Sequence, residues 1–300
     1  YLHAMKYPIG IQNFRKLRED NYVYVDKTRH IFNILGNGNY FFLSRPRRFG
    51  KSLLLSTMHE LYSGSQELFK GLWIEDNWDW EANKRPVIWL RFSKIDYQKK
   101  GLYDALKEEI QDISIQLGVS LSKKTLKSSF EQLIQLTSEQ GKVVLLIDEY
   151  DKPIIDYLDD IPQAEANRDI LKSFYSVLKD SDPYIELLFI TGVSAFSKVS
   201  IFSDLNNLRN ISLSPAANAI AGITQQEMET VFAQALQQGA EQHRIPIDQL
   251  INRVKIWYNG YSWTGEEKLY NPFSLLSFMA DFQFKNYWFE TGTPTFLVKE

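Results

Sequence analysis

The chain has 300 residues, of which 44% are hydrophobic and 24% are charged, and its formal net charge is −3. This composition is typical of a folded protein with one large or two ordinary domains, and it excludes a disordered chain. The slightly acidic total excludes a protein coated in positive charge for nucleic acid, although it leaves room for a local basic groove. The absence of cysteine excludes disulfides, thiolate nucleophiles and cysteine-based metal sites.

The pattern also lacks the signals of a membrane or secreted protein. The N-terminal segment becomes polar too early for a signal peptide, and no run of about 18 apolar residues occurs. We therefore expect no membrane partner and a cytoplasmic location.

The first predicted elements lie near the N-terminus. Asp26 or Thr28 would cap a short helix that ends at the turn signal Gly36-Asn37-Gly38. The apolar run Phe41-Phe42-Leu43 then predicts a buried strand.

A polar turn follows this strand, and Gly50-Lys51-Ser52 then opens an apolar, helix-like segment. Strand, loop and helix start in this order are the context that a phosphate-binding P-loop requires. The first N–H groups of a helix have no partner within it, and the helix dipole adds partial positive charge, so an anion is stabilised there. Gly50 would allow close approach of a phosphate, Lys51 would reach the β- and γ-phosphates, and Ser52 would ligate Mg²⁺.

One position departs from the usual Gly-x-x-x-x-Gly-Lys-Ser/Thr pattern, because Arg45 stands where the first glycine is expected. A short Gly-Lys-Ser match also arises by chance, so an ordinary helix start is the alternative. The residues expected to bind the nucleotide are Arg45, Pro46, Arg47, Arg48, Phe49, Gly50, Lys51, Ser52 and Leu53.

Strands and helices alternate further along the chain. Apolar runs predict buried strands at residues 86–92, 142–147 and 185–190, and helical spacing predicts helices at 102–117, 126–136 and 164–179. This alternation predicts an α/β fold in which helices sandwich a parallel sheet.

Two carboxylates, Asp148 and Glu149, follow one of these strands directly. Open α/β sheets bind their ligands at the carboxyl ends of the strands. Asp148 would therefore hold Mg²⁺ through its water shell, and Glu149 would orient and deprotonate an attacking water. The alternative is that the pair merely solubilises a strand end, but the upstream Lys51 and Ser52 favour the catalytic interpretation.

Two further residues are candidates for contact with a γ-phosphate. Thr191 ends the strand at 185–190 and occupies the place of a sensor residue in the wider P-loop class, with Ser194 in reserve. The alternative is a threonine that bonds only backbone. Arg209 is a candidate arginine finger, in cis or across a subunit boundary, because a planar cation suits charge spread over phosphate oxygens. The alternative is a solvated surface arginine.

The pattern changes after Gly222, where no buried parallel strand remains. Thr224-Gln225-Gln226-Glu227 is a capping box at the start of a helix, residues 247–257 predict a second helix, and Asn271-Pro272 begins a third. We therefore predict two domains, a core at residues 5–217 and a small helical domain at residues 218–300.

Several stretches together carry a family resemblance. They are Arg45-Pro46-Arg47-Arg48-Phe49-Gly50-Lys51-Ser52, Ile147-Asp148-Glu149-Tyr150-Asp151-Lys152-Pro153 and Phe189-Ile190-Thr191-Gly192-Val193-Ser194, with shorter matches such as Phe196-Ser197-Lys198 and Tyr287-Trp288-Phe289. The chain resembles the AAA-ATPase-like family of bacterial P-loop proteins over nearly its whole length. Arg at the first glycine position is itself part of that family's pattern.

The resemblance implies Mg²⁺-dependent binding and hydrolysis of ATP, with residues 218–300 acting as a lid over the nucleotide. It also implies that the segment before the first strand, at Tyr24 or Lys27, packs near the adenine, although Tyr24 as ordinary packing is the alternative. Members often carry a PD-(D/E)xK nuclease-like domain downstream. That domain is not expected here, because the Glu-x-Lys at Glu266-Glu267-Lys268 has no preceding apolar strand.

The leading hypothesis is an ATPase that drives or gates an effector such as a nuclease-like domain, in a chain that also forms homo-oligomers. One alternative is a nucleotide-gated switch with little turnover. Another is a DNA-associated motor or nuclease regulator, in which Arg45, Arg47 and Arg48 contact a nucleic-acid backbone.

Overall fold

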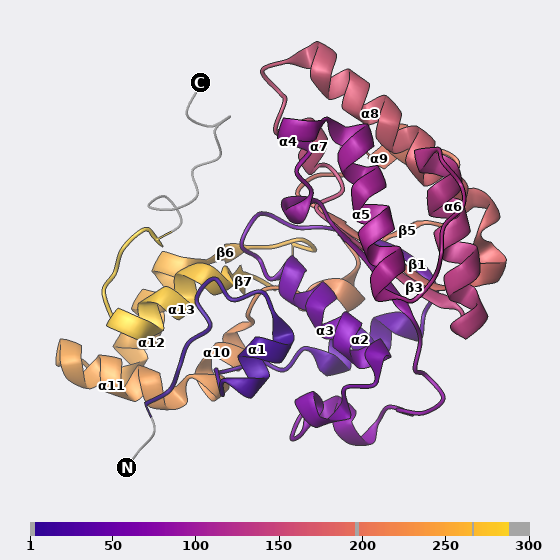
Figure 1. The fold of residues 1–300 in the computed structure, drawn as a ribbon. Coiled ribbons are helices and arrows are strands. Elements are labelled where there is room, and N and C mark those ends of the chain that lie inside the picture. The colour runs from indigo at the N-terminus through magenta and orange to yellow at the C-terminus, as the bar shows by residue number, and fades with distance from the viewer. Residues whose placement is uncertain (1–3, 196–197, 266, 288–300) are drawn as a thin grey trace.

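A single sheet organises the chain, of which the computed structural model describes residues 4–195, 198–265 and 267–287. The sheet has five strands in the order β2-β3-β4-β1-β5, and every neighbouring pair is parallel (Figure 1). The strands are β1 (Tyr40–Ser44), β2 (Val87–Arg91), β3 (Val143–Asp148), β4 (Ile185–Gly192) and β5 (Arg209–Asn210). Because all strands run the same way, their carboxyl ends meet at one edge. The predicted α/β class and parallel sheet are confirmed.

Alternating side chains build a core on each face of the sheet. Phe41 and Leu43 of β1 face one side, where α1 (Phe14–Glu19), α2 (Thr28–Leu35) and α3 (Lys51–Ser63) pack. Phe42 faces the other side, which α5 (Leu102–Gln116), α6 (Leu126–Thr137) and α8 (Ile161–Tyr175) cover. Burial on both faces explains why β3 consists of β-branched and aliphatic residues up to its terminal aspartate.

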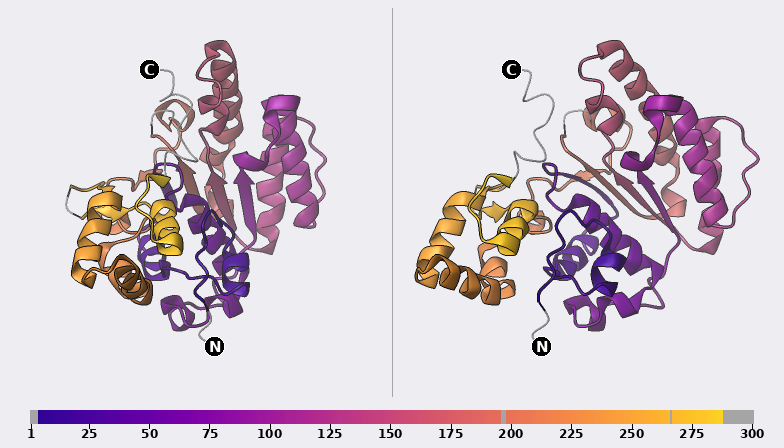
Figure 2. Two further views of the ribbon diagram at one scale, coloured as in Figure 1. Left: turned by 90° about the vertical axis from the view of Figure 1, so that its left-hand side faces the viewer. Right: turned by 60° about the vertical axis from the view of Figure 1, so that its left-hand side comes forward.

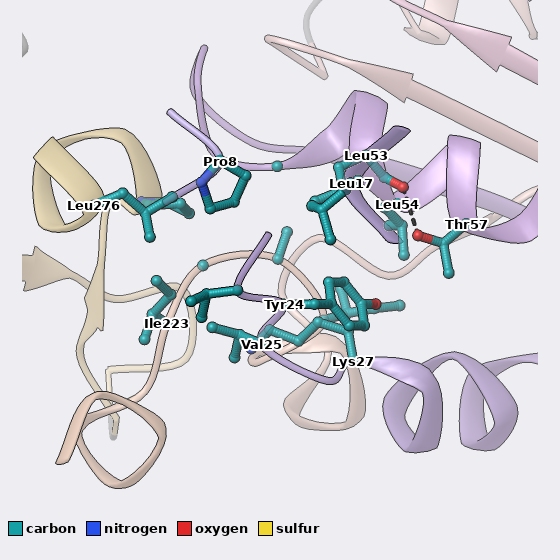
Figure 3. Close-up of a pocket in the computed structure, with 16 residues that line it drawn as sticks. Pro8, Leu17, Tyr24, Val25, Lys27, Leu53, Leu54, Thr57, Ile223 and Leu276 are labelled. Atoms are coloured by element: carbon teal, nitrogen blue, oxygen red, sulfur yellow. Dashed lines mark hydrogen bonds between the residues drawn. The ribbon is translucent and has the colours of Figure 1, made fainter. Parts of the chain in front are cut away.

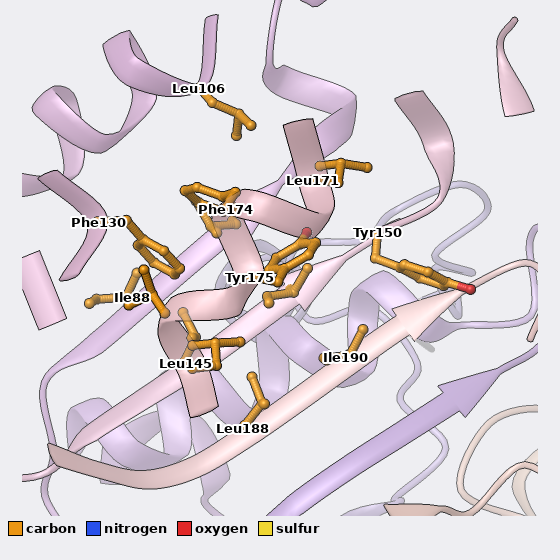
Figure 4. Close-up of a cluster of buried hydrophobic side chains, with 14 of the residues drawn as sticks. Ile88, Leu106, Phe130, Leu145, Tyr150, Leu171, Phe174, Tyr175, Leu188 and Ile190 are labelled. Carbon is orange, nitrogen blue, oxygen red and sulfur yellow. The ribbon is translucent and has the colours of Figure 1, made fainter. Parts of the chain in front are cut away.

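Aromatic rings fill the space between the sheet and the helices α5, α6 and α8 (Figure 4). Phe130 of α6 and Phe174 of α8 stack with their ring centroids 4.1 Å apart, above Leu145 and Leu188 of the central strands. Each such ring contributes about 2 to 3 kcal/mol by leaving water. This layer therefore buries one face of the central strands.

Short helices complete the core. They are α4 (Tyr97–Lys100), α7 (Lys152–Ile155) and α9 (Lys198–Ile201), with 3₁₀ turns at Gln66–Phe69, Trp73–Asp76, Phe92–Lys94, Ser138–Gln140, Ser176–Asp180, Asp182–Tyr184 and Pro215–Ala217.

The C-terminal unit, residues 222–287, has a hydrophobic cluster of its own. It contains α10 (Gln225–Val231), α11 (Ala233–His243), α12 (Ile247–Tyr258), α13 (Pro272–Asp281) and an antiparallel ribbon of β6 (Asn259–Tyr261) and β7 (Leu269–Tyr270). The predicted capping box at Thr224 and Glu227 is confirmed. Figure 2 shows these helices as a separate body beside the N-terminal leader, whose Tyr7, Val23 and Val25 pack against their cluster.

Other local patterns differ from the prediction. The prediction for the C-terminal domain contained helices only and no β6–β7 ribbon. These strands are two or three residues long, too short to give a recognisable pattern in the sequence. The N-cap of α2 is Lys27, while the Asp26 carboxylate accepts from the Thr28 amide.

Some predicted features lie outside the described residues, namely Phe196-Ser197, Glu266, Trp288-Phe289 and the remainder of the predicted second domain. No helix in the described ranges is both long and apolar enough to cross a membrane.

Candidate functional site

The glycine-lysine turn, residues 45–51, connects the carboxyl end of β1 to the first turn of α3. Gly50 occupies the N-cap position with φ 88°, a left-handed conformation that costs a residue with a side chain about 1 to 2 kcal/mol. The N-cap residue Gly50 has no side chain with which to cap α3. Its first N–H groups therefore remain available to an anion, as the sequence predicts.

Lys51 is buried at the start of α3, with only 5% of its surface exposed. Its ammonium donates to the carbonyl oxygens of Arg45 at 2.8 Å and Pro46 at 2.7 Å. Burial lowers the pKa of Lys51 to about 8, against the opposing attraction of Asp148 and Glu149. The lysine thus sits inside its own turn, next to two carboxylates.

Three oxygen-bearing side chains meet at the carboxyl edge of the sheet. The Ser52 hydroxyl donates to Asp148 Oδ2 at 2.6 Å, and the Thr191 hydroxyl donates to Asp148 Oδ1 at 2.8 Å. Asp148 and Thr191 are almost fully buried. The Thr191 hydroxyl therefore binds the Asp148 carboxylate in this structure, whereas the sequence predicts that it contacts the γ-phosphate.

Glu149 adopts a left-handed backbone conformation with φ 57° and lines the cavity in front of the turn. Burial, and secondly the adjacent Asp148 charge, raise its pKa. Strained non-glycine residues of this kind concentrate at functional sites. A carboxyl with a raised pKa is suited to accept a proton near neutral pH.

The cavity has a volume of about 480 Å³, which is within the usual range for small-molecule sites. Arg47, Arg48 and Ser52 line it from the turn and α3, the leader contributes Pro8, and α13 contributes Phe273. The predicted binding segment and the C-terminal unit thus face each other across one cavity.

An apolar slot of about 80 Å³ adjoins the cavity and shares Gly50 and Leu53 with it (Figure 3). Tyr24 and Lys27 both line this slot, beside the start of α3. Lys27 forms an ion pair with Glu227 at 2.6 Å, which joins the leader to α10.

Two predicted arginines point away from the cavity. The Arg45 guanidinium is 1% exposed and donates to the carbonyl oxygens of Ser212 and Ala217, so burial removes it from both a phosphate and a nucleic-acid backbone. Arg209 is exposed, pairs with Phe41 in the sheet register and donates to the Asn37 carbonyl before β1. It therefore lies toward the amino ends of the strands, where it does not act as a finger in cis.

The remaining turn residues have different surroundings. Phe49 is fully buried against Tyr261 and Trp263 of the C-terminal unit, so its backbone alone can contact a ligand. Arg48 stacks on Phe273 with 4.4 Å between the guanidinium carbon and the ring centroid.

The role of Asp151 was not predicted from the sequence. This buried carboxylate accepts from the amides of Val193 at 3.2 Å and Ser194 at 3.0 Å, and so holds the segment after β4. Its proximity to Asp148 along the chain was the available signal. Ser194, the reserve sensor, is occupied by this contact.

A resident metal would find few protein ligands. Within the ranges described, no group of three or more histidine, aspartate or glutamate residues is arranged to hold a metal ion. Ser52 and Asp148 nevertheless supply the hard oxygen donors that Mg²⁺ prefers, and Mg²⁺ at phosphate sites takes its other ligands from water and phosphate. The donor set therefore fits a magnesium–nucleotide complex.

A parallel sheet flanked by helices, with serine, lysine and aspartate gathered at its carboxyl edge, is consistent with an α/β protein of P-loop-like fold. A family model described as "Predicted AAA-ATPase" matches residues 8–202, and the chain belongs to this AAA-ATPase-like family.

A relative from Azotobacter chroococcum mcd 1, described as "Uncharacterized protein in vnfD 5'region", is 44% identical over 297 residues. The match covers 98% of this chain and 55% of the relative, so the chain spans about half of that protein's length. No solved structure matches the chain.

Proposed function

We propose that this protein binds ATP with Mg²⁺ and hydrolyses it. The observation that supports this most directly is the Ser52–Asp148–Thr191 network, which reaches the cavity wall through Ser52, next to the lysine of the turn. Membership of a family of predicted AAA-ATPases agrees with it.

Each side chain has a defined task in this proposal. The first amides of α3 and the Lys51 ammonium hold the phosphates, while Ser52 and Asp148 hold Mg²⁺, which neutralises charge on the phosphate oxygens when bound. Glu149 orients the attacking water and accepts its proton. Thr191 fixes the Asp148 carboxylate through its hydrogen bond, and Arg47 adds positive charge at the cavity wall.

The apolar slot provides a place for the base. It adjoins the start of α3, so a base within it would lie beside phosphates held by the turn. Tyr24 and the aliphatic stem of Lys27 offer apolar surface for a flat ring. The choice of ATP as the nucleotide rests on family membership, and the slot supports only an apolar contact with part of a base.

Two substitutions test the proposal. Lys51→Ala should abolish binding of Mg–ATP, whereas Glu149→Gln should bind it and lose turnover by a factor of about 100 or more. Isothermal titration and phosphate release measure the two properties separately. The exposed residues Lys142 and Glu139 provide matched controls, since Lys142→Ala and Glu139→Gln change the same groups away from the cavity. Turnover by Glu149→Gln at the wild-type rate would contradict the catalytic assignment.

A nucleotide-gated switch is the second candidate, because the C-terminal unit lines the cavity through Pro272 and Phe273. In that case ATP would order this unit against the core with slow hydrolysis, and the effector would lie in another part of a longer protein. Hydrogen exchange in residues 222–287 with ATP and with ADP distinguishes the candidates. Identical protection with both nucleotides would exclude the switch.

A further inference from the structure

Arg45 is an unusual residue to find in a phosphate-binding turn, because its large charged side chain is completely enclosed. Its guanidinium donates to the carbonyl oxygens of Ser44 at 2.9 Å, Ser212 at 2.7 Å and Ala217 at 3.1 Å. Burying a cation without a carboxylate partner is unfavourable unless hydrogen bonds compensate, and burial lowers the pKa of Arg45 to about 10. A surface arginine would avoid this penalty, so the enclosed position needs another explanation.

One flat face of the Arg45 guanidinium stacks on an aromatic ring of the C-terminal unit. The Arg45 guanidinium carbon lies 4.5 Å from the ring centroid of Trp263, just beyond β6. Arginine is well suited to this arrangement, because its planar group can stack on an aromatic ring and donate hydrogen bonds in its own plane. Arg45 thus joins the turn, the 212–217 segment and the C-terminal unit.

Phe49 makes a second connection from the same turn. Its ring packs edge-on against Tyr261 at 4.9 Å and Trp263 at 5.5 Å between centroids. A methyl group added at Gly222 would lie 2.6 Å from the Phe49 ring, so the start of the C-terminal unit fits closely around this side chain. Arg45 and Phe49, near the two ends of the turn, therefore both contact the segment of residues 261–263.

The link continues to Lys51 through the backbone of Arg45. The carbonyl oxygen of Arg45 accepts from the Lys51 ammonium at 2.8 Å, and its amide donates to Gly192 at the end of β4. A chain of contacts therefore connects Lys51 to Trp263 through the backbone and the side chain of Arg45.

We propose that Arg45 is a positioning residue that couples the conformation of the glycine-lysine turn to the segment of residues 259–263, so that the C-terminal unit controls nucleotide affinity through Trp263. This inference rests on the proposed nucleotide site and adds its regulation. In this proposal Arg45 replaces the first glycine because its side-chain contacts with Ser212, Ala217 and Trp263 stabilise the conformation of the turn. In a glycine-rich loop the backbone conformation itself has this function.

The test is the substitution Arg45→Gly, which restores the full Gly-x-x-x-x-Gly-Lys-Ser pattern. If Arg45 were only a tolerated departure, this variant would bind Mg–ATP as tightly as the wild type or more tightly. The coupling predicts the opposite, a rise in Kd of about tenfold or more. Trp263→Leu should weaken binding to a similar degree, and the double variant should be little weaker than either single one, because both remove the same contact.

Matched controls and a second readout separate coupling from general damage. Arg253→Ala removes another arginine–aromatic stack, at 4.5 Å from Phe284 inside the C-terminal unit, and should leave the affinity unchanged. In the wild type, Mg–ATP should slow hydrogen exchange in residues 259–263, and this response should vanish in Arg45→Gly. If Arg45→Gly does not fold, Trp263→Phe keeps an aromatic ring and should give an intermediate Kd.

The outcomes distinguish the two proposals. A wild type that binds no nucleotide overturns the proposed function and this inference together. A wild type that binds, with Arg45→Gly or Trp263→Leu binding equally well, overturns the coupling alone.

Discussion

Ser52 donates its hydroxyl proton to Asp148 Oδ2 across 2.6 Å, although the two residues are 96 positions apart in the chain. The contact joins the first turn of α3 to the carboxyl end of β3 and places two oxygen donors beside the cavity. Both oxygens are of the hard type that Mg²⁺ prefers, so Ser52 and Asp148 would hold the cation of a magnesium–nucleotide complex. The first prediction concerns this pair.

Ser52→Ala should weaken binding of Mg–ATP about tenfold, while binding of ATP without metal should change little, because only the metal contact is lost. Titration with Mg²⁺ and with EDTA measures the difference. Ser63→Ala, at the other end of α3, is the control and should match the wild type. An equal loss with and without Mg²⁺ would assign Ser52 to the phosphates directly.

The pH dependence of binding follows from Lys51, whose pKa burial lowers to about 8. The ammonium form attracts phosphate, so the free protein is competent at pH 7 and loses the charge as the pH rises through 8. Affinity for Mg–ATP should therefore be level near pH 7 and fall by about tenfold per pH unit well above 8, as one proton is required. Lys51→Arg stays charged throughout this range. Its binding, even if weaker, should show no such fall.

Replacement of Glu149 by glycine should raise stability while it removes turnover. The left-handed φ of 57° strains any residue with a side chain, and burial beside Asp148 disfavours the second carboxylate. Relief of both should add about 1 kcal/mol to the free energy of unfolding. Urea unfolding measures it. Arg244→Gly, with φ 55° at the end of α11, should gain stability without losing activity. A less stable Glu149→Gly would show that the side chain contributes more than the strain costs.

The largely buried ion pair between Lys27 and Glu227, whose side chains are 11% and 19% exposed, connects the leader to α10 at 2.6 Å. Lys27→Met leaves the Glu227 carboxylate without its cation, and should lower the free energy of unfolding by about 3 kcal/mol. The double variant Lys27→Met/Glu227→Gln should recover most of this loss, because no lone charge remains and glutamine preserves the capping box. Lys100→Met, at the exposed pair with Glu108, should lose less than about 1 kcal/mol. Equal losses at the two lysines would mean that Lys27 is hydrated.

Local pattern was sufficient to predict the parallel sheet and the meeting of Ser52 with Asp148 at its carboxyl edge. Continuous β-branched runs such as residues 143–147 have few stable alternatives to a strand buried on both faces, and a parallel sheet then brings the carboxyl ends together. That rule predicts from the sequence that Lys51, Ser52 and Asp148 meet at one edge of the sheet. Helix ends were equally readable where a cap acts within three or four residues, as at Thr224 and Asn271.

Side-chain directions over long separations could not be read from the same pattern. Arg45 turns away from the cavity because its partners are the carbonyl groups of Ser212 and Ala217 and the ring of Trp263, and no local rule places these beside β1. Arg209 lies toward the amino ends of the strands because the register pairs it with Phe41, one residue from the start of β1. Propensity and periodicity act over a few residues, whereas register and cross-chain hydrogen bonds depend on how the whole chain packs. For this reason the sequence predicts where Ser52 and Asp148 lie, whereas only the folded protein shows where Arg45 and Arg209 lie.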